Sequence, residues 1–103
     1  MVLIQLLLPV VEDTDPNAPF AQTRQELAMH FTGLTAYVRS PAKGLWNAPD
    51  GHTEQDNVVM VEVVTEQFDR EWWRSYANVL AQRFQQNVIH VRALAIEMLD
   101  QDA

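Results

Sequence analysis

The hydrophobic positions of the chain recur with two periods, and the period of two predicts strands. Short apolar or partly alternating runs, which fit strands with successive residues on opposite faces, occur at Val2–Leu8, Leu34–Arg39, Asn57–Val64 and Val88–Ile96. The first run is apolar on both of its faces, which is typical of a strand in the interior of a sheet. We therefore predict four strands, with Val2–Leu8 in the middle of the sheet.

Two further runs carry apolar residues at the spacing of an amphipathic helix. The first, Phe20–Thr32, follows Pro19 and is expected to end at Gly33. The second, Asp69–Gln86, begins with Asp69 as its N-cap. Its apolar stripe is formed by Trp73, Ala77, Leu80 and Phe84, and is widened by Trp72, Tyr76 and Val79. Because this surface is wider than one sheet contact requires, we expect part of it to meet a second subunit.

The order strand, helix, strand, strand, helix, strand predicts a fold. It is the order of an α+β, ferredoxin-like βαββαβ domain, with a four-stranded antiparallel sheet in spatial order 4-1-3-2 and both helices on one face. A chain of 103 residues holds one such domain, which we expect to span residues 1–103.

The second and third predicted strands flank an irregular connection. Ser40–Asp56 runs to about seventeen residues, contains two Pro and two Gly, and is predicted to be a long loop with a turn at Pro49–His52. We expect the loop to close over the sheet. Trp46 within it is a candidate lid over the sheet face or a plug that packs against a partner.

Composition narrows the range of partners and cofactors. A net charge of −7 without a basic patch argues against nucleic acid and anionic membranes, and the apolar start of about eleven residues is too short to span a bilayer. The absence of Cys fits a cytoplasmic protein. The three His lie on a predicted helix, loop and strand, so we expect no metal, and no Gly-rich phosphate loop indicates a cofactor.

Helices on one side leave the other face of the sheet uncovered. The alternation assigns to this free face a mixture of apolar and polar residues: Leu3, Gln5, Leu7, Tyr37, Arg39, Val58, Met60, Glu62, His90, Arg92 and Leu94. An apolar patch of that size is rarely left in water without a partner or ligand. We therefore predict a homodimer that pairs through the sheet face.

The polar members of the free face form the sharpest candidate site. We expect Glu62 to neighbour Arg39 on the adjoining strand, and His90 and Arg92 to lie across the first strand. In the functional interpretation both arginines anchor a carboxylate or enolate oxygen, His90 or Glu62 transfers a proton, and Tyr37 donates a hydrogen bond. In the structural interpretation Glu62 and Arg39 form an ion pair at the subunit interface.

The element order and the half-apolar free face resemble the dimeric α/β-barrel superfamily. The segments Thr35-Ala36-Tyr37, Arg39-Ser40-Pro41-Ala42 and Gly44-Leu45-Trp46 are also similar to a group of small, uncharacterised bacterial proteins of that shape. The resemblance implies subunits that pair through their sheets and often enclose a small-molecule cleft. Superfamily relatives include cofactor-free monooxygenases, lactone isomerases and stress-response proteins.

Three functions follow from these observations. The first is a small homodimer that binds a small organic molecule on its free sheet face, without assigned catalysis. The second is a cofactor-independent monooxygenase or isomerase that acts on an acidic or enolisable molecule. The third is a structural interaction module. No motif in the sequence decides among these three functions or whether the protein is an enzyme.

Overall fold

The computed structural model of the chain describes residues 1–9, 15, 17–31, 34–47 and 53–100, with the backbone alone described in 34–47 and 53–57. In chain order the elements are β1 (Val2–Pro9), α1 (Pro19–His30), β2 (Leu34–Asn47), β3 (Thr53–Thr65), α2 (Arg70–Arg83) and β4 (His90–Ala95). The predicted α+β class is confirmed.

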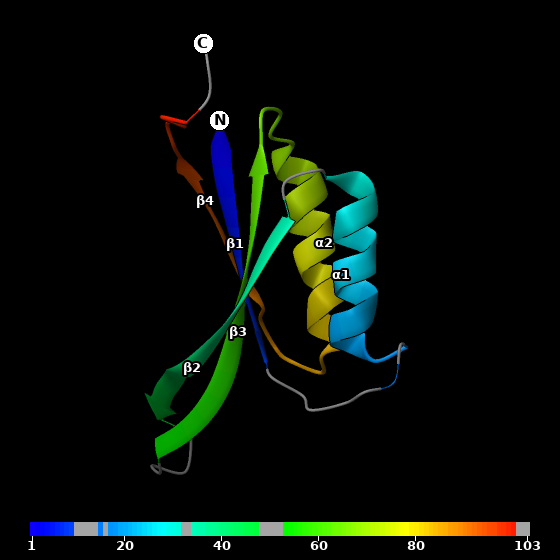
Figure 1. Ribbon diagram of the computed structural model, residues 1–103. Coiled ribbons are helices and arrows are strands. Elements are labelled where there is room, and N and C mark those ends of the chain that lie inside the picture. Colours follow the sequence, from blue (N-terminus) through cyan, green and yellow to red (C-terminus); the bar gives the residue numbers. More distant parts are fainter. Residues whose placement is uncertain (10–14, 16, 32–33, 48–52, 101–103) are drawn as a thin grey trace.

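The strands described here pair in the order β2-β3-β1-β4, and every pairing is antiparallel. Leu6 of β1 pairs with Val61 of β3 on one side and with Val91 of β4 on the other, so β1 lies inside the sheet as its two apolar faces predicted. Both helices lie on the same side of the sheet (Figure 1).

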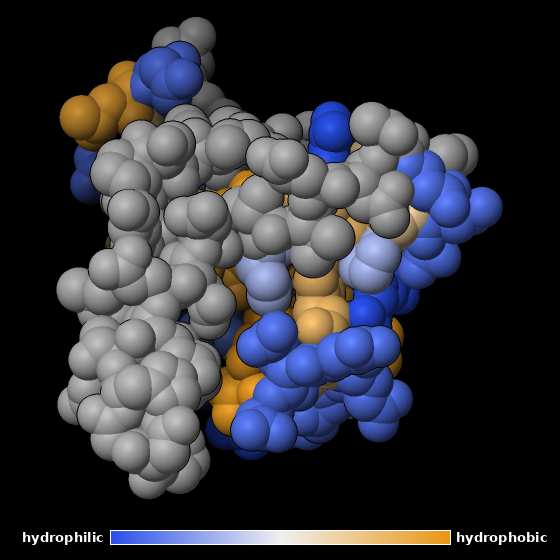
Figure 2. Space-filling view, turned by 90° about the horizontal axis from the view of Figure 1, so that it is seen from below, coloured by the Kyte–Doolittle hydropathy of each residue, from blue (hydrophilic) through white to orange (hydrophobic). Residues whose placement is uncertain are grey.

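The core lies between this side of the sheet and the helices. Alternate residues of β1 and β3 point into it, and their side chains are almost fully buried. The core residues are Ile4, Leu6, Leu8, Leu27, Val59, Val61, Val63, Trp73, Tyr76, Leu80, Phe84 and Ile89. On the outside, hydrophilic residues cover the helices, with a band of hydrophobic residues beside them (Figure 2).

Local chemistry sets where α2 begins and ends. Asp69 is the N-cap, since its carboxylate accepts a hydrogen bond from the backbone N–H of Trp72 at 3.1 Å, as predicted. The helix ends three residues before the predicted Gln86, because Gln85 adopts a positive φ of 55°. The backbone N–H of Gln86 then bonds to Ala81 O at 2.8 Å, which closes the helix without a glycine.

α1 begins at its predicted proline and ends early. Pro19 occupies the first turn, and Thr23 inside the helix donates its hydroxyl to the Pro19 carbonyl at 2.8 Å. The helix stops at His30, since Phe31 already has an extended backbone. The expected cap, Gly33, lies outside the described residues.

The predicted loop between the second and third strands, β2 and β3, is mostly strand, which corrects the sequence expectation. β2 runs on to Asn47 and β3 starts at Thr53, so only the tip, with the predicted turn at Pro49–His52, contains residues outside the description. The register shifts between the pair Val38 with Val59 and the pair Lys43 with Asn57. Between these two pairs β2 covers five residue steps and β3 covers two. This bulge accommodates Pro41, which cannot donate a ladder hydrogen bond.

The outer part of this hairpin projects beyond the sheet. The last pair between β1 and β3 is Pro9 with Val58, whereas β2 and β3 stay paired as far as Asn47 with Thr53. We call residues 43–47 and 53–57 the β-arm. Figure 1 shows it extending away from both helices in a molecule of 52 × 28 × 28 Å. No helix within the described part of the chain is long and apolar enough to cross a membrane.

Candidate functional site

The register arranges the free face of the sheet in cross-strand rows. The middle row is polar and runs from Arg92 of β4 through Gln5 of β1 to Glu62 of β3, with Thr35 of β2 next in register. One neighbouring row brings together Leu94, Leu3 and Val64. The other brings together His90, Leu7 and Met60, with Tyr37 next in register. A polar row therefore lies between two largely apolar ones.

Hydrogen bonds connect the three side chains of the polar row. Gln5 Nε2 donates to Glu62 Oε2 at 2.8 Å, and Arg92 Nε donates to Gln5 Oε1 at 2.9 Å. A carboxylate that is partly buried in an apolar strand must be hydrogen-bonded or paired, and Gln5 supplies the donor. The same amide joins the acid to a cation that lies two strands away.

The register does not make Glu62 and Arg39 the direct cross-strand neighbours that we expected. Thr35 lies opposite Glu62 in the register, and Arg39 is four residues further along β2. At about 3.3 Å per strand residue this is roughly 13 Å along the strand, beyond the range of neighbouring side chains. The side chain of Arg39 lies outside the described residues. Among the described side chains, Gln5 is the hydrogen-bond donor that the structure brings to the acid.

Two predicted site residues lie together on the edge strand. His90 and Arg92 are two residues apart in β4 and therefore lie on the same face of the strand, and both are exposed. Arg92 donates a hydrogen bond from its Nε to Gln5. The terminal nitrogens of its guanidinium have no hydrogen-bond partner among the described side chains. An imidazole and a guanidinium at this spacing can hold an anionic oxygen.

The remaining predicted residues come from β2. The register places Tyr37 next to Met60, and Trp46 opposite Glu54 in the β-arm. The side chains of Tyr37 and Trp46 lie outside the described residues. Trp46 as a lid or plug, and Tyr37 as a hydrogen-bond donor, therefore stay predictions.

The apolar rows beside the polar one are incompletely covered. Leu3, Leu7, Met60 and Val64 are partly buried, whereas Leu94 is 44% exposed. Both helices lie on the far side of the sheet and give this face no cover (Figure 1). The free face described here thus keeps apolar surface on both sides of a hydrogen-bonded polar row.

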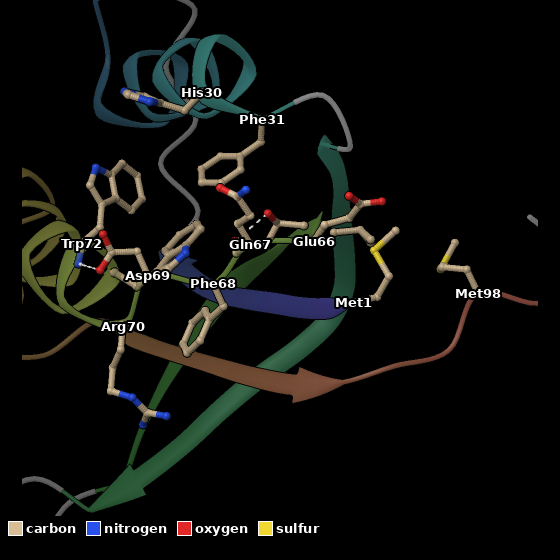
Figure 3. Close-up of a pocket in the computed structure, with 13 residues that line it drawn as sticks. Met1, His30, Phe31, Glu66, Gln67, Phe68, Asp69, Arg70, Trp72 and Met98 are labelled. Atoms are coloured by element: carbon tan, nitrogen blue, oxygen red, sulfur yellow. Dashed lines mark hydrogen bonds between the residues drawn. The ribbon is translucent and has the colours of Figure 1, made fainter. Parts of the chain in front are cut away.

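A separate cleft of about 1140 Å³ opens at the end of the sheet (Figure 3). Its walls come from the end of α1, the connection from β3 to α2 and the start of α2, with Met1 and Met98 at its border. Sequence reasoning did not find this cleft, because its walls lie far apart along the chain.

Aromatic rings form one wall of the cleft. Trp72 stacks on Tyr76 with ring centroids 4.9 Å apart, and it meets Trp73 edge-on at 4.8 Å. The rings of His30 and Phe31 lie 5.4 and 5.6 Å from Trp72. Such a wall can hold a flat ring. The widened stripe of α2 was the available signal, although we assigned it to a subunit contact.

The two helices also share a polar cluster that the sequence analysis missed. Arg83 forms an ion pair with Glu26 and donates to the Thr23 hydroxyl at 3.0 Å. The hydrogen bond to Glu26 raises the pKa of Arg83. Burial, reinforced by the charge of Glu26, raises the pKa of the neighbouring Tyr76 phenol. This cluster links α1 to α2 and has a structural role.

No group of three or more His, Asp or Glu that could hold a metal ion occurs in the part of the chain that the structure describes. Comparison with protein-family models, with curated proteins and with solved structures gave no match to the chain. Function is therefore argued from the geometry alone.

Proposed function

We propose that the chain is a ferredoxin-like subunit that pairs with a second copy through its free sheet face and binds a small organic molecule between the paired sheets. The observation that carries this proposal is the hydrogen-bonded row of Arg92, Gln5 and Glu62 between two apolar rows. The strand order β2-β3-β1-β4 supports the ferredoxin-like subunit. No catalytic step is assigned, and the absence of Cys agrees with a cytoplasmic setting.

The apolar rows and the β-arm both support pairing. Two sheets packed face to face lie about 10 Å apart, which buries Leu3, Leu7, Met60 and Leu94 between them. A two-stranded ribbon is marginally stable alone in water. Among the residues that the structure describes, the strands of the β-arm pair only with each other beyond Pro9 and Val58, so a second copy that packs against the β-arm would stabilise it.

The polar row supports a small anionic or enolisable ligand. Gln5 holds Arg92 through its Nε, so the terminal nitrogens of the guanidinium are left for a ligand, and His90 lies two residues away on the same face of β4. A carboxylate or enolate oxygen bound there would leave its apolar part against Leu7 and Met60. We include Tyr37, Arg39 and Trp46 of β2 in this site as proposed contacts.

Pairing is tested by placing a charge on the free face. Leu94→Lys changes a residue that is 44% exposed, so the subunit itself should fold normally. We expect sedimentation velocity to show a dimer for the natural chain and a monomer, or at least a tenfold weaker dimer, for L94K. A natural chain that stays monomeric at about 100 μM would overturn the proposal.

The matched control lies on the opposite side of the molecule. Val79 of α2 is 46% exposed and belongs to the helix surface that we first assigned to a subunit contact. Val79→Lys should leave the dimer intact. If V79K separates the subunits and L94K does not, the dimer forms through the helices.

Ligand binding is tested by nitrogen-15 NMR with acetoacetate, a small enolisable acid. The side-chain signals of Gln5, His90 and Arg92 should shift together, and His90→Gln should reduce the affinity by about tenfold. An intact dimer in which none of these three signals moves would show that the sheet face pairs without binding such a molecule.

A further inference from the structure

A second concavity lies between α2 and the edge strand β4, on the helix side of the sheet. It encloses about 340 Å³, within the range of small-molecule pockets. At roughly 30 Å³ for each non-hydrogen atom, the volume of a water molecule, it holds about ten such atoms. The free sheet face lies on the other side of the sheet, so this pocket shares only Arg92 with the proposed sheet-face site, and the Nε of Arg92 is bonded there to Gln5.

The floor of the pocket is apolar and belongs to the core. Ile4, Trp73 and Ile89 form it, and they are 0, 4 and 6% exposed. Ala77 of α2 also lines it, and its small side chain leaves space between the helix and the strand. A floor of this kind binds the apolar part of a ligand.

Three arginines and no acid line the same pocket. Arg70, Arg74 and Arg92 account for three of the seven basic residues of a chain whose net charge is −7. The acids at the start of α2, Asp69 and Glu71, do not line the pocket, so the charged residues that line it are all cations and favour an anion. Arginine guanidinium groups bind carboxylates through paired hydrogen bonds.

Two of these arginines come from the start of α2, where their present contacts are weak. The Arg70 guanidinium lies 5.6 Å from the centre of the Phe68 ring, and Figure 3 shows both side chains pointing away from His30. Arg74 is 3.7 Å from Glu71 in a pair that is largely exposed and contributes little. A bound carboxylate can therefore recruit either group at small cost.

We propose that this pocket binds a small carboxylate with an apolar aliphatic or aromatic body. The carboxylate lies between Arg70 and Arg74, and the body lies on Ile4, Trp73 and Ile89 beside Ala77. Arg92 borders the pocket from β4. The site holds one molecule in each subunit and does not depend on pairing of the sheets.

Isothermal titration with phenylacetate, which has ten non-hydrogen atoms, tests the proposal. Phenylacetamide has the same shape without the charge, and acetate has the charge without the ring. We expect phenylacetate to bind one molecule per subunit, at least tenfold more tightly than either. Equal binding of phenylacetate and phenylacetamide would overturn the proposal, as would no detectable binding of phenylacetate at about 10 mM.

Substitution of the arginines locates the site. Arg70→Gln and Arg74→Gln should each weaken phenylacetate binding by about tenfold, the usual effect of losing a charge-assisted hydrogen bond. Arg24→Gln is the matched control, because Arg24 lies 6.0 Å from the Phe20 ring on α1, outside the pocket. A loss in R24Q equal to that in R70Q would show only general attraction of anions.

A variant that fills the pocket tests whether binding needs the cavity itself or only its arginines. Ala77→Phe fills the space and keeps all three cations, so phenylacetate binding should be lost. Binding to folded A77F at the natural affinity would overturn the proposal, and the exposed R70Q and R74Q variants decide the matter if A77F does not fold.

The two proposals can fail separately. Arg70 and Arg74 lie on α2, so R70Q and R74Q should leave the sheet-face dimer and acetoacetate binding unchanged.

Discussion

The two faces of one sheet differ in what their side chains do. On the helix side, β1 and β3 contribute Ile4, Leu6, Val61 and other aliphatic residues, which are fully buried and carry no polar atoms. On the free side, the intervening residues of the same strands include Gln5 and Glu62, which are only partly buried and bind each other. Buried aliphatic side chains are thus concentrated on one face, and hydrogen-bonded polar side chains lie on the other.

The largest expected difference between the faces comes from neighbouring leucines. Leu6→Ala removes a fully buried side chain and should lower the free energy of unfolding by about 3 kcal/mol. Leu7→Ala removes a partly buried one on the free face and should cost less than about 1.5 kcal/mol. Urea denaturation at low protein concentration measures both. Equal losses would mean that the free face is as tightly packed as the core.

A smaller effect is expected from breaking the polar row. Gln5→Leu removes the donor to the Glu62 carboxylate and should lower the free energy of unfolding by about 1–2 kcal/mol. Adding Glu62→Leu removes the unpartnered acid as well, so the double variant should recover most of the loss. If the two changes are simply additive in denaturant unfolding, the hydrogen bond does not link the two strands.

The smallest effect is a pH dependence on the helix side. Burial raises the pKa of Tyr76 above its ordinary value of 10.0. The protonated phenol is therefore favoured in the folded chain, so its contribution is full below pH 10 and is lost as the pH rises through the higher folded pKa. Tyr76→Phe should flatten the decline in stability above pH 10. Parallel urea curves for both proteins between about pH 8 and 11 would contradict this.

Sequence patterns predicted the parts of this fold that depend on local residues. The period-two runs placed the strands, and Asp69 placed the start of α2, because both signals are read within a few neighbouring positions. The ends of the helices were less predictable. Gln85 closes α2 in a conformation that usually favours glycine, and nothing in its neighbours indicates this.

The site was harder to predict because it depends on register. The sequence showed that Glu62 needs a partner, but Gln5 lies 57 positions away and reaches it only through the pairing of β1 with β3. The β-arm was missed for a different reason. Pro41 and Gly44 were interpreted as loop signals, whereas a bulged edge ribbon tolerates both residues.

The amide of Gln5 has one donor end and one acceptor end, and this gives the free face a direction. The positive end of the polar row is Arg92 on the edge strand β4, and the negative end is Glu62 on β3, toward the middle of the sheet. A two-fold axis that lies between two stacked sheets and crosses the middle of this row at a right angle reverses its direction, so the two copies then present opposite charges to each other. In that arrangement one neutral side chain would make the row complementary to its own copy, and stacking of two rows in the same direction would be disfavoured.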